Sequence, residues 1–344
     1  MSEKIISIMD VAKLARVSPA TVSNTLTGRK PVSEKLAKRV REAARTLDYR
    51  VDPLASQLRT GEARIIAVVV PDLDNPFFTS VVSSIEQCLV AENYEVIVAS
   101  AQGRVETETS RLKAILAWRP AGVIVLPCTD EFPGRELLEN AGTPYVVADR
   151  GGDSLPADTV SIDNIAAGAA AVRHLVELGH TNILIAATLL ELANIRQRCA
   201  GARDAMRQYG LPDPAVVELG LTSDEACKRL TAWFRDSATP TAVVALTNFT
   251  TLGVLTTIAE QGWRVAEQIS LIGFDDYAWM SARTTPITAI RQPVREMGRA
   301  IWDLLSARIR GDLAPPKHVE LPCELIIRAS TRDVRHPAAP MNGP

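Results

Sequence analysis

The stretch IMDVAKLARVSPATVSNTL, Ile8 to Leu26, decides how the N-terminal part of this 344-residue chain folds. Val11, Leu14 and Ala15 recur at i, i+3 and i+4, which is the spacing of one apolar helix face. Ser18 is a typical N-cap residue, and the proline after it suits the first helical position, where the backbone N–H has no intrahelical partner. The stretch therefore predicts two short helices joined by a tight turn.

The second of these helices carries small polar side chains on one face. Val22 and Leu26 point to one side, whereas Thr21, Ser23 and Asn24 are left outward. Hydroxyl groups commonly contact DNA phosphates, and an asparagine amide can read a base edge in the major groove. This face is therefore a candidate surface for binding DNA.

A third helix is expected after a break in the pattern. Gly28 and Pro31 interrupt the chain, and Ser33 is placed to cap the helix that follows. Its apolar stripe consists of Leu36, Val40, Ala43, Ala44 and Leu47.

Charge is distributed unevenly along the chain. Residues 1 to 62 hold 12 Lys and Arg against 7 Asp and Glu, while the remaining residues hold 26 against 33. A basic segment attracts polyanions, of which nucleic acid is the usual one. Taken alone, the same charge fits an ordinary solvated helix surface equally well.

Three patterns in the first 61 residues resemble the DNA-binding headpiece and hinge of the lactose repressor (LacI/GalR) family. DVAxxAxVSxxTVSxxL begins at Asp10, VSxxxxxxVxxAxxxLxY spans Val32 to Tyr49, and DPLASQLRTG spans Asp52 to Gly61. The resemblance implies a recognition helix from Ser18 to Leu26 and a hinge helix from Pro53 to Leu58. The implied DNA contacts are Pro19, Ala20 and Asn24 with bases, Ser18, Thr21 and Ser23 with phosphates, and Leu58 as an apolar wedge in the minor groove.

Two departures from the family pattern affect these expectations. Arg16 stands in the turn where glycine is common, so it must adopt a left-handed backbone if the turn keeps its shape. Pro19 and Ala20 have no side-chain donor for a base, which leaves Asn24 as the main polar reader.

The rest of the chain alternates short apolar runs with amphipathic helical stretches. Such alternation predicts an α/β body of parallel sheets with helices on both faces, and two series in tandem predict two lobes with a ligand cleft at the strand ends. The expected helices include Phe77 to Ala91, Arg104 to Trp118, Asn164 to Leu178, Asn194 to Tyr209 and Asn248 to Gln261. The expected strands are RIIAVVV at Arg64, EVIVA at Glu95, GVIVL at Gly122, YVVA at Tyr145, NILIA at Asn182, AVVEL at Ala215, AVVAL at Ala242 and SLIGF at Ser270.

The resemblance continues through this body, which is similar to the periplasmic-binding-protein-like core of the same family. PDLDNPFF at Pro71, ADR at Ala148, RQRCAGARDAM at Arg196 and GFDD at Gly273 are among its landmarks. It implies that Arg198 binds an effector and that the carboxylate of Asp275, in the GFDD landmark, accepts hydrogen bonds from the hydroxyl groups of that effector. The full set of predicted effector contacts is Phe78, Asp149, Arg150, Arg198, Asn248, Asp275, Trp279 and Gln292.

The effector class is left open between a sugar and a sugar acid, both ahead of a purine or nucleoside. Arg150, Arg196 and Arg198 suit an anionic ligand through bidentate contacts. The family also uses an arginine for neutral sugars, however, and Arg196 can equally form a structural ion pair.

Other functional classes have less support. No G-x-G-x-x-G or phosphate-binding loop follows a strand, the four histidines lack metal-ligand spacing, and the five cysteines are scattered. We therefore expect no enzyme, no catalytic residue, no metal and no cofactor; the alternatives are a metabolite-binding enzyme or a solute receptor with the same body. No signal sequence or membrane span is apparent, so we expect a cytoplasmic protein.

The expected organisation is a headpiece at residues 1–50, a hinge and linker at 51–62, an effector-binding and dimerisation body at 63–330, and a disordered tail at 331–344. The expected protein is a homodimeric transcriptional regulator that represses sugar or sugar-acid metabolism genes. It would bind a near-palindromic operator, because one short helix offers few base contacts and two half-sites double them.

Overall fold

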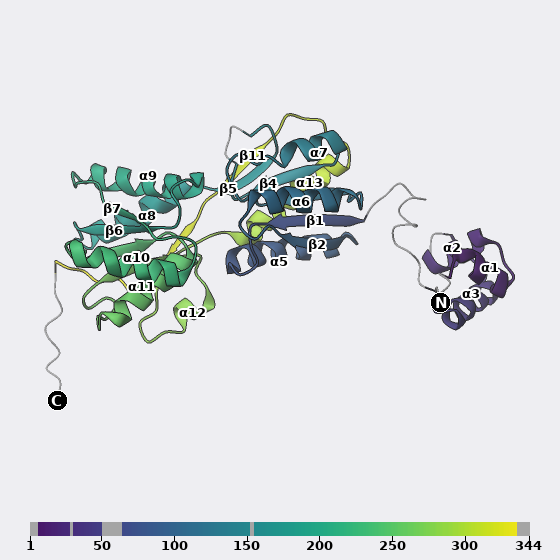
Figure 1. Cartoon of the computed structure of the whole chain (residues 1–344), viewed down its shortest axis with the longest axis horizontal. Coiled ribbons are helices and arrows are strands. Elements are labelled where there is room, and N and C mark those ends of the chain that lie inside the picture. Colours follow the sequence, from purple (N-terminus) through teal and green to yellow (C-terminus); the bar gives the residue numbers. More distant parts are fainter. Residues whose placement is uncertain (1–5, 28–29, 50–63, 152–154, 336–344) are drawn as a thin grey trace. The chain divides into compact units, whose positions relative to one another are not determined.

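The structure is a computed structural model that describes residues 6–27, 30–49, 64–151 and 155–335. The chain divides into two compact units, residues 1–63 and residues 64–344. The first unit is a small three-helix domain (Figure 1). Its helices are α1 (Ile8–Ala15), α2 (Pro19–Thr27) and α3 (Glu34–Thr46).

Apolar side chains from all three helices form the core of this domain. Val11, Val22 and Val40 are fully buried, one from each helix. The expectation that Leu14 belongs to this core is wrong, because it is 51% exposed and Ala12 occupies the buried position instead. At 100° per residue, Val11, Ala12 and the end of α1 face α2 and α3, while position 14 falls outside that arc.

The turn between α1 and α2 has the backbone that the sequence requires. Arg16 is in the left-handed region, with φ 51° and ψ 51°, and its N–H bonds the carbonyls of Ala12 and Lys13. Ser18 caps α2 as predicted, because its Oγ accepts the N–H of Thr21 at 3.1 Å. Ser33 precedes α3, but its side chain makes no capping bond.

The second unit contains two α/β lobes, each built on a six-stranded sheet within the described residues (Figure 1). In lobe 1 all strand pairings are parallel, in the order β11-β5-β4-β3-β1-β2. Its strands are β1 (Ile65–Val70), β2 (Glu95–Ser100), β3 (Gly122–Val125), β4 (Tyr145–Ala148), β5 (Thr159–Ile162) and β11 (His318–Leu321), and its helices are α5 (Pro76–Val90), α6 (Val105–Leu116), α7 (Arg135–Ala141) and α13 (Val294–Ile309).

Helices cover both faces of the lobe 1 sheet. Val68 on β1 packs in the same cluster as residues of α5 and α13, whereas its neighbour Val69 packs with Leu112 of α6 and Leu138 of α7. Because side chains alternate along a strand, a continuous apolar run such as IIAVVV is buried on both sides.

Lobe 2 repeats this plan with one exception. Its sheet has the order β12-β10-β9-β8-β6-β7, and β12 pairs antiparallel with β10, in contrast to the parallel pairing that the sequence predicts for this body. Its strands are β6 (Ile183–Ala187), β7 (Ala215–Glu218), β8 (Ala242–Ala245), β9 (Ser270–Phe274), β10 (Thr288–Arg291) and β12 (Glu324–Ile326), and its helices are α8 (Asn164–Glu177), α9 (Ala193–Gln208), α10 (Ser223–Asp236), α11 (Asn248–Glu260) and α12 (Ala278–Ser281).

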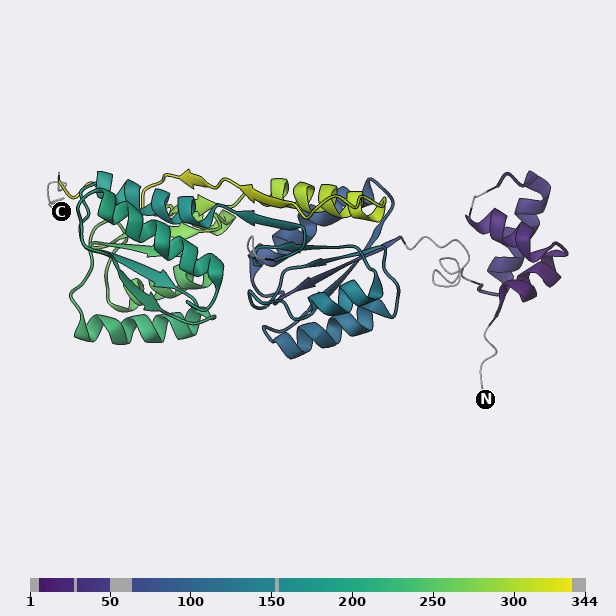
Figure 2. The same cartoon turned by 90° about the horizontal axis from the view of Figure 1, so that it is seen from above.

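The lobes are interleaved in the sequence and do not simply follow one another. Within the described residues the chain passes from lobe 1 to lobe 2 after β5, returns after β10, and passes again to lobe 2 after β11. Figure 2 shows these connecting segments running along one side of the two lobes. The prediction of two lobes in tandem therefore has the right number of lobes and the wrong connectivity.

Helices α8 and α9 lie against each other with their backbones in contact. A Cβ placed on Gly168 would lie 2.0 Å from the carbonyl oxygen of Arg198, and one on Gly201 would lie 1.9 Å from that of Ile165. Glycine at both positions is what permits this close packing. This close packing sets the distance between α9 and α8.

The C-terminal segment is ordered beyond the predicted boundary of the tail. His180 is fully buried, and its Nε2 donates to the carbonyl of Arg332 at 3.1 Å. The N–H of Val334 donates to the carbonyl of Leu178 at 2.9 Å. The boundary at 331 was thus placed too early, because residues 331–335 pack on lobe 2. Residues 336–344 lie outside the described part.

Candidate functional site

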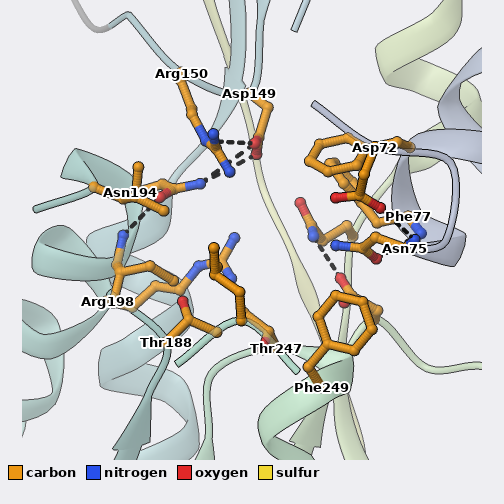
Figure 3. Close-up of a pocket in the computed structure, with 16 residues that line it drawn as sticks. Asp72, Asn75, Phe77, Asp149, Arg150, Thr188, Asn194, Arg198, Thr247 and Phe249 are labelled. Atoms are coloured by element: carbon orange, nitrogen blue, oxygen red, sulfur yellow. Dashed lines mark hydrogen bonds and ion pairs between the residues drawn. The ribbon is translucent and has the colours of Figure 1, made fainter. Parts of the chain in front are cut away.

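A cleft lies between the two lobes, and the empty space in it and in the open solvent at its mouth amounts to about 600 Å³. Side chains from both lobes point into it (Figure 3). Strand ends supply part of the lining, as expected for parallel sheets, and the first turns of α5, α9 and α11 supply much of the rest.

The lobe 1 wall is organised by the start of α5. Asn75 is the N-cap of this helix, and its Oδ1 accepts the N–H of Phe77 at 3.1 Å. Asp72 precedes it and uses one carboxylate oxygen to accept the N–H of Asn75 at 2.7 Å. These bonds fix the polar side chains at the cleft beside the aromatic rings of Phe77 and Phe78.

A second polar group joins the lobes across the cleft. Asp149, at the end of β4, has a positive φ of 68° and is 7% exposed. The Nδ2 of Asn194, from α9 in lobe 2, lies 3.4 Å from both of its carboxylate oxygens. Arg150 lies 3.6 Å from the same carboxylate, but its Nη1 donates to the carbonyls of Pro127 and Cys128. One nitrogen of the guanidinium is therefore committed to lobe 1, whereas its buried Nε has no hydrogen-bond partner among the described residues.

Arg198 occupies the lobe 2 side and is 3% exposed. Its Nε donates to Oδ1 of Asn164 at 2.9 Å and its Nη1 to the carbonyl of Leu246 at 2.6 Å. The guanidinium carbon lies 3.9 Å from the ring centroid of Phe274, a cation–π contact. Burial lowers the pKa of Arg198, and the nearby carboxylate of Asp275 opposes that shift.

Asp275 lies at the end of β9 in a strained turn. It has a φ of 82° and the next residue, Asp276, has one of 44°; Asp276 is held by ion pairs of 2.7 Å to Arg291 and 2.5 Å to Arg328. The Nε2 of Gln292 donates to Asp275 at 2.5 Å. Burial raises the pKa of Asp275, while Arg198 and this amide bond oppose the rise.

The lining carries three acidic side chains and two basic ones. Among the described residues it contains the carboxylates of Asp72, Asp149 and Asp275 against the guanidinium groups of Arg150 and Arg198. All five charged groups already have protein partners, but the buried Nε of Arg150 has no hydrogen-bond partner among the described residues. The Oε1 of Gln292 is buried and has no hydrogen-bond partner among the described residues. The cleft thus has one buried acceptor, on Gln292, and one buried donor, on Arg150, that lack a hydrogen-bond partner within the described part of the chain.

Most of the predicted effector contacts lie on this lining, and two do not. Asn248 is 4% exposed as the first residue of α11; its backbone N–H bonds Asp275, and its N-cap neighbour Thr247 lines the cleft instead. Trp279, on α12, packs with the apolar cluster of α10 and α11. The predicted residues on the lining are Phe78, Asp149, Arg150, Arg198, Asp275 and Gln292.

Several lining residues were absent from the predicted set. Asn194 and Ile195 lie four and three positions before Arg198, so helical periodicity placed them on the same face of α9. Arg196 is not among the lining residues and forms an ion pair with Asp130 at 3.1 Å, which agrees with the ion-pair alternative predicted for it. The remaining lining residues outside the predicted set are Asp72, Asn75, Phe77, Thr188, Leu192, Leu221, Thr247 and Phe249.

The candidate DNA-binding residues gather at the start of α2. Ser18 and Ala20 are exposed, and Pro19, Thr21, Ser23 and Asn24 are partly exposed. The hydroxyl groups of Ser18 and Thr21 lie 2.9 Å apart. Leu58 lies outside the described residues.

Several cysteine and histidine side chains have pKa values that burial shifts in favour of their neutral forms. Burial raises the pKa of Cys128 and Cys323 to about 12 and that of Cys199 to about 11, which disfavours their thiolates. His180 is enclosed by protein, and burial lowers its pKa. Over the described ranges no group of three His, Cys, Asp or Glu could hold a metal ion, and no helix there has the length and apolarity to cross a membrane.

Comparisons with known proteins match both units of the chain. The family model for bacterial regulatory proteins of the lacI family matches residues 7–52, and that for a periplasmic binding protein-like domain matches residues 172–331. The HTH-type transcriptional repressor CytR of Escherichia coli (strain K12) is 32% identical over 96% of this chain and 97% of its own length. The repressor PurR of Aliivibrio salmonicida (strain LFI1238) is 30% identical over 94% and 98%.

Solved structures with ligands have the same fold. The lac repressor dimer bound to operator and the anti-inducer ONPF has a TM-score of 0.83 at 26% identity, covering 96% of this chain and 100% of that one. A LacI family transcriptional regulator from Enterococcus faecium with bound ribose has a TM-score of 0.71 at 26% identity, covering 78% and 99%.

Proposed function

We propose that this chain, which belongs to the lacI family of bacterial regulatory proteins, represses transcription from an operator. A small ligand bound in the cleft would control this repression. The chain is a DNA-binding transcriptional regulator with an effector-binding body, and it is not an enzyme. The observation that carries the ligand-control proposal is the interlobe cleft, whose polar side chains come from both lobes. A ligand that bridges them would stabilise one lobe arrangement over others.

The proposed partner is operator DNA, bound by a homodimer in the cytoplasm. Asn24 would contact a base, and the hydroxyls of Ser18, Thr21 and Ser23 would contact phosphates. Two copies would read the halves of a near-palindrome. Leu58, in the segment from Pro53 to Leu58, would wedge into the minor groove at the operator centre.

Asn24→Ala should weaken specific operator binding by about 5- to 150-fold, since one good base contact contributes about 1–3 kcal/mol. The measurement is fluorescence anisotropy of the full chain on an operator selected from random DNA. Ala166→Ser, on the exposed face of α8, is the control and should bind normally. Equal loss on non-specific DNA, or no loss on the operator, would contradict base reading by Asn24.

We propose further that the effector is an uncharged, polyhydroxylated sugar. Of the two classes left open by the sequence, a sugar acid would bring a further negative charge to a lining that holds three carboxylates, of Asp72, Asp149 and Asp275, against two guanidinium groups. Sugar hydroxyls can donate to these carboxylates and to Oε1 of Gln292. The half-buried ring of Phe249 on the lining offers an apolar surface for a sugar ring face.

Matched pairs of compounds test this class. D-ribose with ribose 5-phosphate, D-glucose with D-glucuronate, cellobiose, and adenosine with its monophosphate would be screened for a rise in melting temperature, because a specific ligand stabilises with occupancy. We expect a neutral sugar to stabilise the chain and its anionic counterpart to do so less. An anionic compound that stabilises more would contradict the neutral class, and adenosine as the main hit would replace sugar by nucleoside.

Control of repression by the ligand is tested by measuring how the ligand and the operator change each other's affinity. The stabilising ligand should change operator affinity, and operator should change ligand affinity by the same factor. Equal ligand affinity in the presence and absence of operator would contradict allosteric control.

A further inference from the structure

The start of α9 lacks what an isolated helix needs. Leu192 occupies its N-cap position and offers no side-chain acceptor, and no acidic residue lies in the first turn. Arg196 instead places a cation there, where the helix dipole favours an anion. The local sequence is therefore unfavourable for a helix that begins at Ala193.

Lobe 1 supplies the missing group. Asp130 lies in the loop after β3, and its carboxylate oxygens accept the N–H of Ala193 at 2.8 and 3.1 Å. The same carboxylate lies 3.1 Å from Nη2 of Arg196. The Nη1 of Arg196 also donates to the carbonyls of Leu190 and Glu191, so the guanidinium is held in place to meet the carboxylate.

This contact joins the two lobes at the helix that lines the cleft. Leu192, Asn194, Ile195 and Arg198 line the cleft from the first turns of α9, whereas Asp130 itself does not. If the lobes separate at this point, the N-terminus of α9 loses its cap and Arg196 loses its carboxylate. Both losses are free-energy costs of opening, so the contact favours the arrangement in which the lobes stay together.

We infer that Asp130 is a positioning residue that clamps lobe 1 to the start of α9 and so sets the lobe arrangement in which the cleft is formed. It acts on the ligand only through α9. The inference concerns the free protein and does not depend on which ligand class is proposed above. A failed ligand screen would leave it intact, and a failed clamp would leave the ligand class intact.

The test measures the separation of the lobes in the full chain without ligand. Glu106 on α6 and Lys228 on α10 are each replaced by a keto amino acid that carries a spin label, so that the native cysteines remain. Labelled chains are diluted with unlabelled ones, so that each distance is measured within one chain. Both helices lie on the side away from the connecting segments in Figure 2, where opening increases the distance. Pulsed electron resonance then gives the distance distribution.

Asp130→Ala should shift this distribution to longer distances and broaden it. Asp130→Asn keeps one carbonyl oxygen that can accept the N–H of Ala193, so it should give an intermediate shift. This variant also replaces Asp130→Ala in the test if the alanine variant folds poorly. Arg196→Ala in addition to Asp130→Ala should add little, because both belong to one contact.

Asp213→Ala is the matched control. Asp213 forms a two-bond ion pair with Arg207 of α9, at 2.8 and 2.7 Å, entirely within lobe 2. It should leave the distribution unchanged even if it lowers stability slightly. An unchanged distribution in both Asp130 variants, or an equal shift in Asp213→Ala, would overturn the clamp.

Discussion

Gly168→Ala should destabilise the body by about 1–3 kcal/mol or more and displace Arg198 from its position at the cleft. The added methyl would lie 2.0 Å from the carbonyl oxygen of Arg198 and 2.8 Å from its carbonyl carbon. These are backbone atoms, so no side-chain rotation can make room. Helices α8 and α9 must separate instead, which moves Arg198 relative to its partner carbonyl at Leu246.

The sign of the change in the free energy of unfolding distinguishes the effect of packing from the effect of helix propensity. In an exposed helix interior, alanine is more favourable than glycine by about 0.8–1 kcal/mol. Urea unfolding of the full chain therefore gives opposite signs for the two explanations. Ala166→Ser, which adds one atom on the exposed face of α8, should change stability by less than about 0.5 kcal/mol. A Gly168→Ala variant as stable as the parent would show that the helices can separate without cost.

The central strands of the body could be predicted because their apolar runs are buried on both faces. IIAVVV in β1 and SLIGF in β9 stand out for this reason. β5 reads TVSI, β11 reads HVEL and β12 reads ELI, and these short strands mix polar with apolar residues. Without them, the crossings between the lobes could not be deduced from the sequence.

The candidate cleft divides in a similar way. Asp149 and Asp275 follow apolar runs directly, so strand ends and family resemblance both pointed to them. Thr247 and Asn248 differ by one position, and only the start of α11 decides that the threonine faces the cleft and the asparagine is buried. The role of Asp130 depends on a contact 63 residues away in the chain, which no local pattern contains.

Arg198→Ala should abolish the response to effector while operator binding persists. The substitution removes the cation beside Asp275, leaves the carbonyl of Leu246 without its donor and removes the contact with Phe274. Losing a charge-assisted hydrogen bond to the ligand lowers its affinity by about 10- to 150-fold, for about 1.5–3 kcal/mol. Stability should fall by about 2–4 kcal/mol, because buried partners are left unpaired.

Arg207→Ala separates the local from the general effect of removing an arginine from α9. Arg207 is exposed and pairs with Asp213, so its loss should change stability little and leave the ligand response normal. The ligand is the neutral sugar found by thermal shift, and operator affinity is measured with and without it.

Without Arg198 the pKa of Asp275 should rise further, since burial raises it and Arg198 opposes that rise. Protonated Asp275 accepts hydrogen bonds less well, so residual ligand binding in Arg198→Ala should weaken as the pH falls, and pH-independent residual binding would exclude Asp275 as the acceptor.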